Sequence, residues 1–264
     1  MSFMRSPLRA GIAAAALILP ALAPAAAATV TAAPAVLAPM QHLSSTSGSA
    51  TPFFISHGGG VRHADTSSTN WAGYAATGST YTSVTTTFTQ PKVTCSSGDQ
   101  YSSFWVGLDG YSSDSVEQTG TEADCVGKTA EYSAWYELYP AYPVTYSNTV
   151  KAGDTIVEEV IYEGSNKYEM YIADSTQGWS HTTTKTSSGD ARSSAEVIAE
   201  APYSNGVLPL ANFGTVTFNS STVNGSSLSA SNPVSIDMDT TSGTVKASTG
   251  SLSGGTFAIA WKHQ

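Results

Sequence analysis

Residues 155–172 read TIVEEVIYEGSNKYEMYI and decide the fold class. Two runs rich in β-branched and aromatic residues, 155–162 and 167–172, flank the sequence Glu163-Gly164-Ser165-Asn166. Runs of this composition favour strands, and Gly, Ser and Asn between them favour a tight turn. The stretch therefore predicts a β-hairpin.

The same composition returns along the rest of the chain. Strand-forming runs occur at 81–88, 214–218 and 256–261, and clusters of Gly, Ser, Asn and Asp interrupt them at short intervals. No long stretch has the 3.6-residue periodicity of an amphipathic helix. Many short strands with frequent turns are typical of an all-β domain, which we expect to be an antiparallel sandwich or barrel.

The first 65 residues differ from the domain that follows. Residues 1–28 combine Arg5 and Arg9 with an apolar stretch at 11–22 and alanines at 26–28, the pattern of a secretory signal peptide. The apolar stretch is shorter than a membrane-spanning helix, which needs about 20 residues, and no Cys for a lipid anchor lies nearby. Residues 29–65 are rich in Ala, Pro, Ser and Thr, which predicts a pro-segment or flexible linker. We therefore predict a secreted, extracellular protein with no membrane attachment after signal cleavage, whose folded domain is residues 66–264.

From Asp65 onward the chain is acidic, with 20 Asp and Glu against 8 Lys and Arg, a net charge of −12. Phosphate binding needs clustered basic residues, so no nucleic-acid partner is expected. The acidity suits solubility in water. It also suits a protein that works in acid, where protonation of the carboxylates reduces the charge. Composition leaves both explanations open.

The chain has two cysteines, Cys95 and Cys125. An even number of cysteines in an exported protein predicts a disulfide. Free thiols are the alternative, and two cysteines alone are a poor basis for a metal site.

Histidine is scarce in the domain, where only His181 and His263 occur. The sequence contains no GxSxG elbow, HExxH zinc motif or phosphate-binding loop. We therefore expect no metal or cofactor. If the protein is an enzyme, carboxylates, amides or tyrosines must supply its acid–base chemistry.

Alternation along three strand-like segments gathers such groups on one side. The sets that share a face are Trp105, Gly107 and Asp109; Trp135, Glu137 and Tyr139; and Glu196, Ile198 and Glu200. Phe104, Val106 and Leu108 form the opposite, core-like face of the first segment. The pattern suits a substrate-binding sheet, but ordinary solvent-exposed strand faces would look the same.

Four blocks of this sequence resemble the glutamic peptidases, also called eqolisins. They are STNWAGY at 68–74, FWVGLDG at 104–110 continued by VEQTG at 116–120, AWYELYP at 134–140, and AEVIAE at 195–200. Each block alone is weak, but four in this order are specific. Glu122, where fungal relatives often have Asp, and the cysteine layout depart from the fungal pattern, so the sequence is more similar to a bacterial branch.

The resemblance implies a lectin-like sandwich of two antiparallel sheets and an endopeptidase that cleaves polypeptides in acid, which we expect to be a monomer. It implies Gln118 and Glu200 as the catalytic pair. Peptide hydrolysis needs an activated water and a stabilised oxyanion, so Glu200 is expected to be the general base and then acid, and Gln118 the oxyanion stabiliser. Positions that match the cleft lining are Trp71, Trp105, Asp109, Trp135 and Glu137.

Two other functions remain open from the sequence. Lectin-like sandwiches often bind sugars, and a glycoside hydrolase would need two carboxylates across the cleft, for which Glu137 and Glu200 are candidates. A non-catalytic binding protein on the same scaffold is the third possibility, because a fold does not fix a function.

Overall fold

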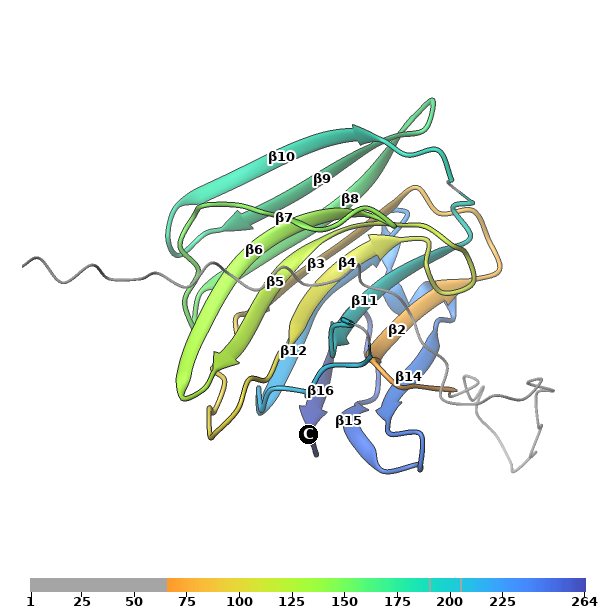
Figure 1. Ribbon diagram of the computed structural model, residues 1–264. Coiled ribbons are helices and arrows are strands. Elements are labelled where there is room, and N and C mark those ends of the chain that lie inside the picture. The colour runs from red at the N-terminus through yellow and green to blue at the C-terminus, as the bar shows by residue number, and fades with distance from the viewer. Residues whose placement is uncertain (1–65, 190, 205) are drawn as a thin grey trace, which may run out of the picture. The chain divides into compact units, whose positions relative to one another are not determined.

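The computed structural model describes residues 66–189, 191–204 and 206–264 (Figure 1). The predicted signal peptide and pro-segment lie outside these residues. The strands are β1 (Thr66–Ser68), β2 (Trp71–Thr77), β3 (Ser83–Thr89), β4 (Ser103–Leu108), β5 (Val116–Val126), β6 (Thr129–Tyr139), β7 (Val144–Thr145), β8 (Thr155–Gly164), β9 (Lys167–Asp174), β10 (Trp179–Thr186), β11 (Ser194–Glu200), β12 (Thr215–Val223), β13 (Ser226–Ser227), β14 (Val234–Asp239), β15 (Val245–Thr249) and β16 (Phe257–Trp261). One 3₁₀ turn, η1 (Leu228–Ser231), is the only helical element in the described part of the chain. That part contains no helix long and apolar enough to cross a membrane.

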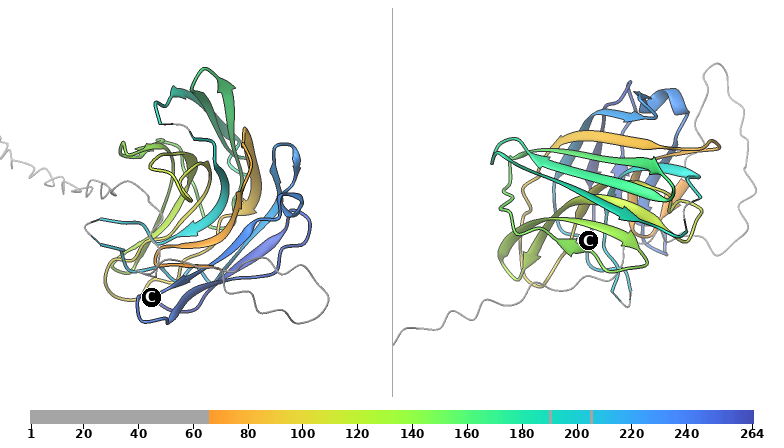
Figure 2. Two further views of the ribbon diagram at one scale, coloured as in Figure 1. Left: turned by 90° about the vertical axis from the view of Figure 1, so that its right-hand side faces the viewer. Right: turned by 90° about the horizontal axis from the view of Figure 1, so that it is seen from above.

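The strands form one hydrogen-bonded series in the order β10-β9-β8-β3-β12-β16-β15-β14-β2-β11-β4-β5-β6-β7. Every pair in this series is antiparallel, and only the short β1 pairs in parallel, with β14. The series folds over so that β4 and β5 pack across from β8 and β9 (Figure 2). The antiparallel β-sandwich expected from the sequence is therefore confirmed.

The predicted hairpin at 155–172 is present as β8 and β9. Ser165 and Asn166 form its two-residue turn with φ values of 53° and 60°, the left-handed conformation that such hairpin turns require. The register shifts by one residue between Tyr162 and Gly164, so β8 carries a bulge just before the turn.

The main core lies between the two layers. Phe104, Val106 and Leu108 of β4 are completely buried there, as the alternation predicted. Phe88 of β3 contacts Phe104 and Phe218, with ring centroids 6.1 and 5.2 Å apart. Because Phe104, Val106 and Leu108 occupy the inner face of β4, the residues between them along the strand, Trp105 and Gly107, lie on the opposite face.

Cys95 and Cys125 form a disulfide with Cα atoms 5.4 Å apart, which confirms the predicted pairing. The bond ties the loop after β3 to the end of β5 and closes a segment with a sequence separation of 30.

Replacing both cysteines by serine is expected to lower the free energy of unfolding by about 3–4 kcal/mol, because the unfolded chain regains the entropy of an open loop. Urea unfolding at mildly acidic pH, followed by circular dichroism, measures the change. An unaltered unfolding midpoint in the double variant would contradict this role for the bond.

Candidate active site

Five neighbouring strands, β2, β11, β4, β5 and β6, carry the polar and aromatic residues that the sequence singled out (Figure 1). Their register places Glu200 opposite Trp71 and Ser103. It also places Gln118 between Gly107 and Glu137. The structure therefore brings these groups onto the one face that points away from the phenylalanine core.

Aromatic side chains form an apolar cluster on this face. Trp71 and Trp105 meet edge to face, with centroids 4.9 Å apart. The cluster consists of Trp71, Ala75, Trp105, Val116, Trp135, Ile198 and Ile236, with Tyr111 and Tyr139 packed against it. Gly120 makes this packing possible, because a Cβ there would lie 2.6 Å from the Cβ of Trp105 and 2.9 Å from the Trp135 ring.

Glu200 is completely buried, and two N–H donors hold its carboxylate. Nδ2 of Asn70 donates to Oε1 at 3.1 Å, and Nε1 of Trp105 donates to Oε2 at 2.9 Å. Each oxygen keeps further acceptor capacity, because a carboxylate oxygen accepts up to two hydrogen bonds. The arrangement fixes the carboxylate in place and leaves it able to exchange a proton.

Burial raises the pKa of Glu200 well above that of an ordinary glutamate. The hydrogen bond from Trp105 opposes this rise, the nearby charge of Glu137 adds to it, and the side chains of Asn70 and Trp71 oppose it again. Donors favour the charged form of an acid, whereas burial and like charges favour the neutral form. Glu200 therefore remains protonated to a higher pH than a carboxyl in water.

Gln118 is also completely buried, and it is bonded to Glu137. Its Nε2 donates to Oε2 of Glu137 at 2.6 Å, while its Oε1 has no hydrogen-bond partner among the described residues. The amide nitrogen has two hydrogens, so one N–H and one carbonyl oxygen remain for other groups. Glu137 thus contacts Gln118 directly and acts on Glu200 through its charge.

Asp109 lies at the end of β4, where its carboxylate holds the loop that precedes β11. It accepts hydrogen bonds from the backbone N–H groups of Arg192 and Ser193 at 2.7 and 2.8 Å. The hydroxyls of Ser193 and Ser113 donate to it at 3.0 and 3.4 Å. Of the residues expected to line the cleft, Asp109 is thus the one whose side chain is committed to the chain's own loop.

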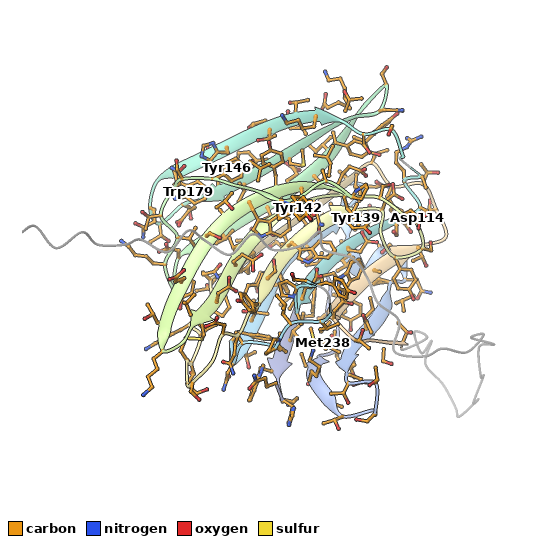
Figure 3. All side chains as sticks on the ribbon, in the orientation of Figure 1. Asp114, Tyr139, Tyr142, Tyr146, Trp179 and Met238 are labelled. Atoms are coloured by element: carbon orange, nitrogen blue, oxygen red, sulfur yellow. A yellow bond between two sulfur atoms is a disulfide. The ribbon has the colours of Figure 1, made fainter. Side chains whose placement is uncertain are left out.

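Sequence reasoning missed three features of this region. Asn70 stands in a quoted block but received no role. Glu122 and Asp124, on the same face of β5, have raised pKa values: burial is the main cause for both, and Asp124 reaches about 7. A cavity of about 630 Å³ also lies beside the end of β6, where Tyr139 and Tyr142 form part of its wall (Figure 3). Tyr142 is 61% exposed, but this exposure is visible only in the structure, so the sequence offers no signal for this cavity.

No group of three or more His, Cys, Asp and Glu side chains suited to a metal ion occurs within residues 66–189, 191–204 and 206–264. The residues at hand for chemistry are a buried carboxyl and a buried amide on an aromatic-lined sheet. This combination is compatible with a hydrolase.

Comparison with known proteins identifies the family. Residues 69–261 match the family model described as the Peptidase A4 family. The chain is 31% identical to aspergillopepsin-2 of Aspergillus niger over 199 residues, which cover 65% of this chain and 71% of that protein.

Solved structures agree with this match. A crystal structure of scytalido-glutamic peptidase with a transition state analog inhibitor superposes with a TM-score of 0.65 at 27% identity, covering 74% of this chain and 98% of that one. Aspergilloglutamic peptidase from Aspergillus niger gives a TM-score of 0.54 at 27% identity, covering 62% of this chain and 99% of that one. The chain belongs to the Peptidase A4 family of glutamic peptidases and is a hydrolase.

Proposed function

We propose that this protein is a secreted endopeptidase that cleaves polypeptides in acid, with Glu200 and Gln118 as its catalytic pair. The observation that carries the proposal is the hydrogen bonding of the two residues on one face. Two N–H donors fix Glu200, and Glu137 fixes Gln118 through a single N–H, so that both side chains retain the atoms that the chemistry needs.

The reaction begins with a water molecule between the two side chains. Ionised Glu200 takes a proton from this water as its oxygen attacks the carbonyl carbon of the substrate. The carbonyl oxygen becomes an oxyanion, and the second N–H of Gln118 donates to it. When the C–N bond breaks, Glu200 returns the proton to the leaving amine, so the products are a carboxylic acid and an amine.

Glu137 and the aromatic residues have supporting roles in this proposal. Because Nε2 of Gln118 is bonded to Glu137, the amide cannot rotate freely and its Oε1 is available to hold the water. Trp71, Trp105 and Trp135 are buried in the apolar cluster on this face, where they support the site, and Trp105 also donates to Glu200. The transition state analog bound by scytalido-glutamic peptidase supports the same chemistry for this chain.

The pH range follows from two opposing effects. A base must be ionised, so activity increases as the pH rises through the elevated pKa of Glu200. Other buried carboxyls with raised pKa values destabilise the fold once they ionise, which limits activity at higher pH. We therefore expect a bell-shaped profile whose acid limb lies above the pKa of an ordinary glutamate.

Secretion is part of this proposal. The signal-like residues 1–28, the single disulfide and the acidity of the domain all suit an acidic extracellular medium. The assignments to a bacterial branch of the family and to a monomer stay predictions.

Changing Gln118 to Ala is expected to lower kcat for a peptide substrate by about 10²–10³-fold, because the oxyanion loses its donor. KM should change much less, since the interaction forms mainly in the transition state. Initial rates on a quenched fluorescent peptide measure both constants. Gln177→Ala, at an exposed position in the β9–β10 turn, is the matched control and should behave as the wild type.

The same variant distinguishes a peptidase from a glycoside hydrolase. A glycosidase that used Glu137 and Glu200 would have no need of Gln118. If wild type and Gln118→Ala hydrolysed an oligosaccharide equally well and neither cleaved peptides, the proposed function would be wrong.

A further inference from the structure

The short segment between β1 and β2 supplies one of the two donors to Glu200. Ser68 is the last residue of β1, and Asn70 directly precedes Trp71, the first residue of β2. Both Ser68 and Asn70 are completely buried. Between them, the backbone carbonyl of Thr69 accepts a hydrogen bond from Nζ of Lys246 at 3.3 Å. The segment is thus held from β15 as well as from its own strands.

The hydroxyl of Ser68 determines which way the Asn70 amide points. It donates its only proton to Oδ1 of Asn70 at 3.0 Å. Oγ of Ser68 also accepts hydrogen bonds from the backbone N–H groups of Trp71 and Asn70, at 3.1 and 3.3 Å. With Oδ1 engaged by Ser68, Nδ2 faces Oε1 of Glu200 at 3.1 Å.

The opposite orientation of the amide is unfavourable at both ends. It would present an N–H group to a hydroxyl oxygen that already accepts two hydrogen bonds. It would also set Oδ1 of Asn70 against an oxygen of Glu200, where two acceptors repel when the carboxylate is ionised. Ser68 and Asn70 therefore act as one unit.

We propose that Asn70 is a positioning residue for Glu200, and that Ser68 orients its amide for this purpose. The unit holds Oε1 from the β2 side while Trp105 holds Oε2 from the β4 side. It keeps the carboxylate in one rotamer and stabilises its ionised form, which is the form that accepts the proton from water. This inference rests on the proposed role of Glu200 as general base.

Few other charges act on Glu200. Glu137 of β6 and Glu122 of β5 are the titratable groups on this face whose charges act on it from other strands, and Glu196 shares its own strand and face. On β2 and β4 the same face carries Trp71, Gly73, Ala75, Trp105 and Gly107, none of which titrates. Asn70 therefore contributes one of the few interactions that oppose the effects of burial and like charge.

The test is the pH profile of kcat/KM for Asn70→Ala, Ser68→Ala and the double variant. Losing a donor to the charged form raises the pKa of a carboxyl, so we expect the acid limb of Asn70→Ala to move up by about one pH unit. Ser68→Ala should move it in the same direction by less. The double variant should match Asn70→Ala, because the hydroxyl acts only through the amide. KM should stay nearly constant, and Asn219→Ala, at an exposed position on β12, is the control.

A second measurement is independent of turnover. With ¹³C-labelled glutamate, the carboxyl resonance that is absent in Glu200→Gln reports the titration of Glu200 directly. We expect it to titrate at higher pH in Asn70→Ala and in Ser68→Ala. If Asn70→Ala does not fold, Ser68→Ala alone decides, because it keeps the amide and removes only its orienting partner.

An acid limb and a Glu200 titration that stay at their wild-type pH in a folded variant would overturn the inference. So would additive effects in the double variant. The proposed function fails by a different result, namely full activity in Glu200→Gln. Loss of activity in Glu200→Gln together with an unmoved profile in Asn70→Ala would reject only the positioning role.

Discussion

Replacing Glu200 by Gln is expected to reduce kcat for peptide hydrolysis by at least about 10³-fold, within the range that general acid–base catalysis contributes. The amide has nearly the shape of the carboxyl, and its single oxygen can still accept a hydrogen bond from Trp105 or Asn70. It has no proton-accepting oxygen of comparable basicity, so the water is not activated and the leaving amine is not protonated. The fold should be retained, and kcat on a fluorogenic peptide at mildly acidic pH measures the loss.

Glu196→Gln is the matched control for this variant. Glu196 lies on the same strand and the same face, is completely buried, and has a pKa raised mainly by burial. It contacts neither Gln118 nor Glu200 in any hydrogen bond that we observe among the described residues. We expect Glu196→Gln to keep most of the activity. Equal losses in both variants would point to a general effect of buried carboxyls instead of a specific base.

The stability of the fold is expected to fall strongly as the pH rises from about 4 to 8. Burial raises the pKa of Glu122, Asp124, Glu158, Glu196 and Glu200, with Asp124 at about 7. An acid with a raised pKa in the folded state stabilises the fold most below its unfolded pKa, near 4, and this contribution is lost as the pH rises through the folded value. Each unit of elevation corresponds to about 1.4 kcal/mol, so the midpoint of chemical unfolding should fall steadily across this pH range.

Glu158 offers the clearest single test of this effect. It lies in the core face of β8, opposite Thr86 and Ile172, and neither carboxylate oxygen has a hydrogen-bond partner within the described part of the chain. Glu158→Gln removes the ionisation and keeps the shape. The variant should unfold like the wild type at pH 4 and be more stable at pH 8 by about 2 kcal/mol or more.

Chemical unfolding at the two pH values measures this prediction. Glu163→Gln, at an exposed position before the β8–β9 turn, is the control and should change stability little at either pH. A wild type that is equally stable at pH 4 and pH 8 would contradict the account of the buried carboxyls.

The sequence predicted the strands and their faces well, because alternation and turn chemistry are local properties. The hairpin at 155–172 has the expected turn, and Phe104, Val106 and Leu108 form the expected core face. The gathering of Glu137 and Glu200 on one face also follows from alternation, once the strands are neighbours. That arrangement depends on strand order, which came only from the structure.

Several features escaped prediction for physical reasons. Alternation places Glu158 in line with Ile156 and Val160, on the core face, although a carboxylate is rarely buried there. The two-donor support of Glu200 joins residues 130 and 95 positions apart, so no local pattern reveals it. Asp109 matched the motif as expected, but its bonds to Arg192 and Ser193 depend on a loop conformation that the motif does not contain.

The most direct test of the account is digestion of an unfolded protein by the full chain over a pH series from 2 to 8, with the peptides identified by mass spectrometry. Wild type and Glu200→Gln are compared after circular dichroism has shown that both are folded and the state of the N-terminal region has been determined. The account predicts internal cleavage by the wild type in mild acid, little at pH 8, and none by the variant. Absence of cleavage at every pH by a folded chain freed of residues 29–65, or equal cleavage by the variant, would contradict it.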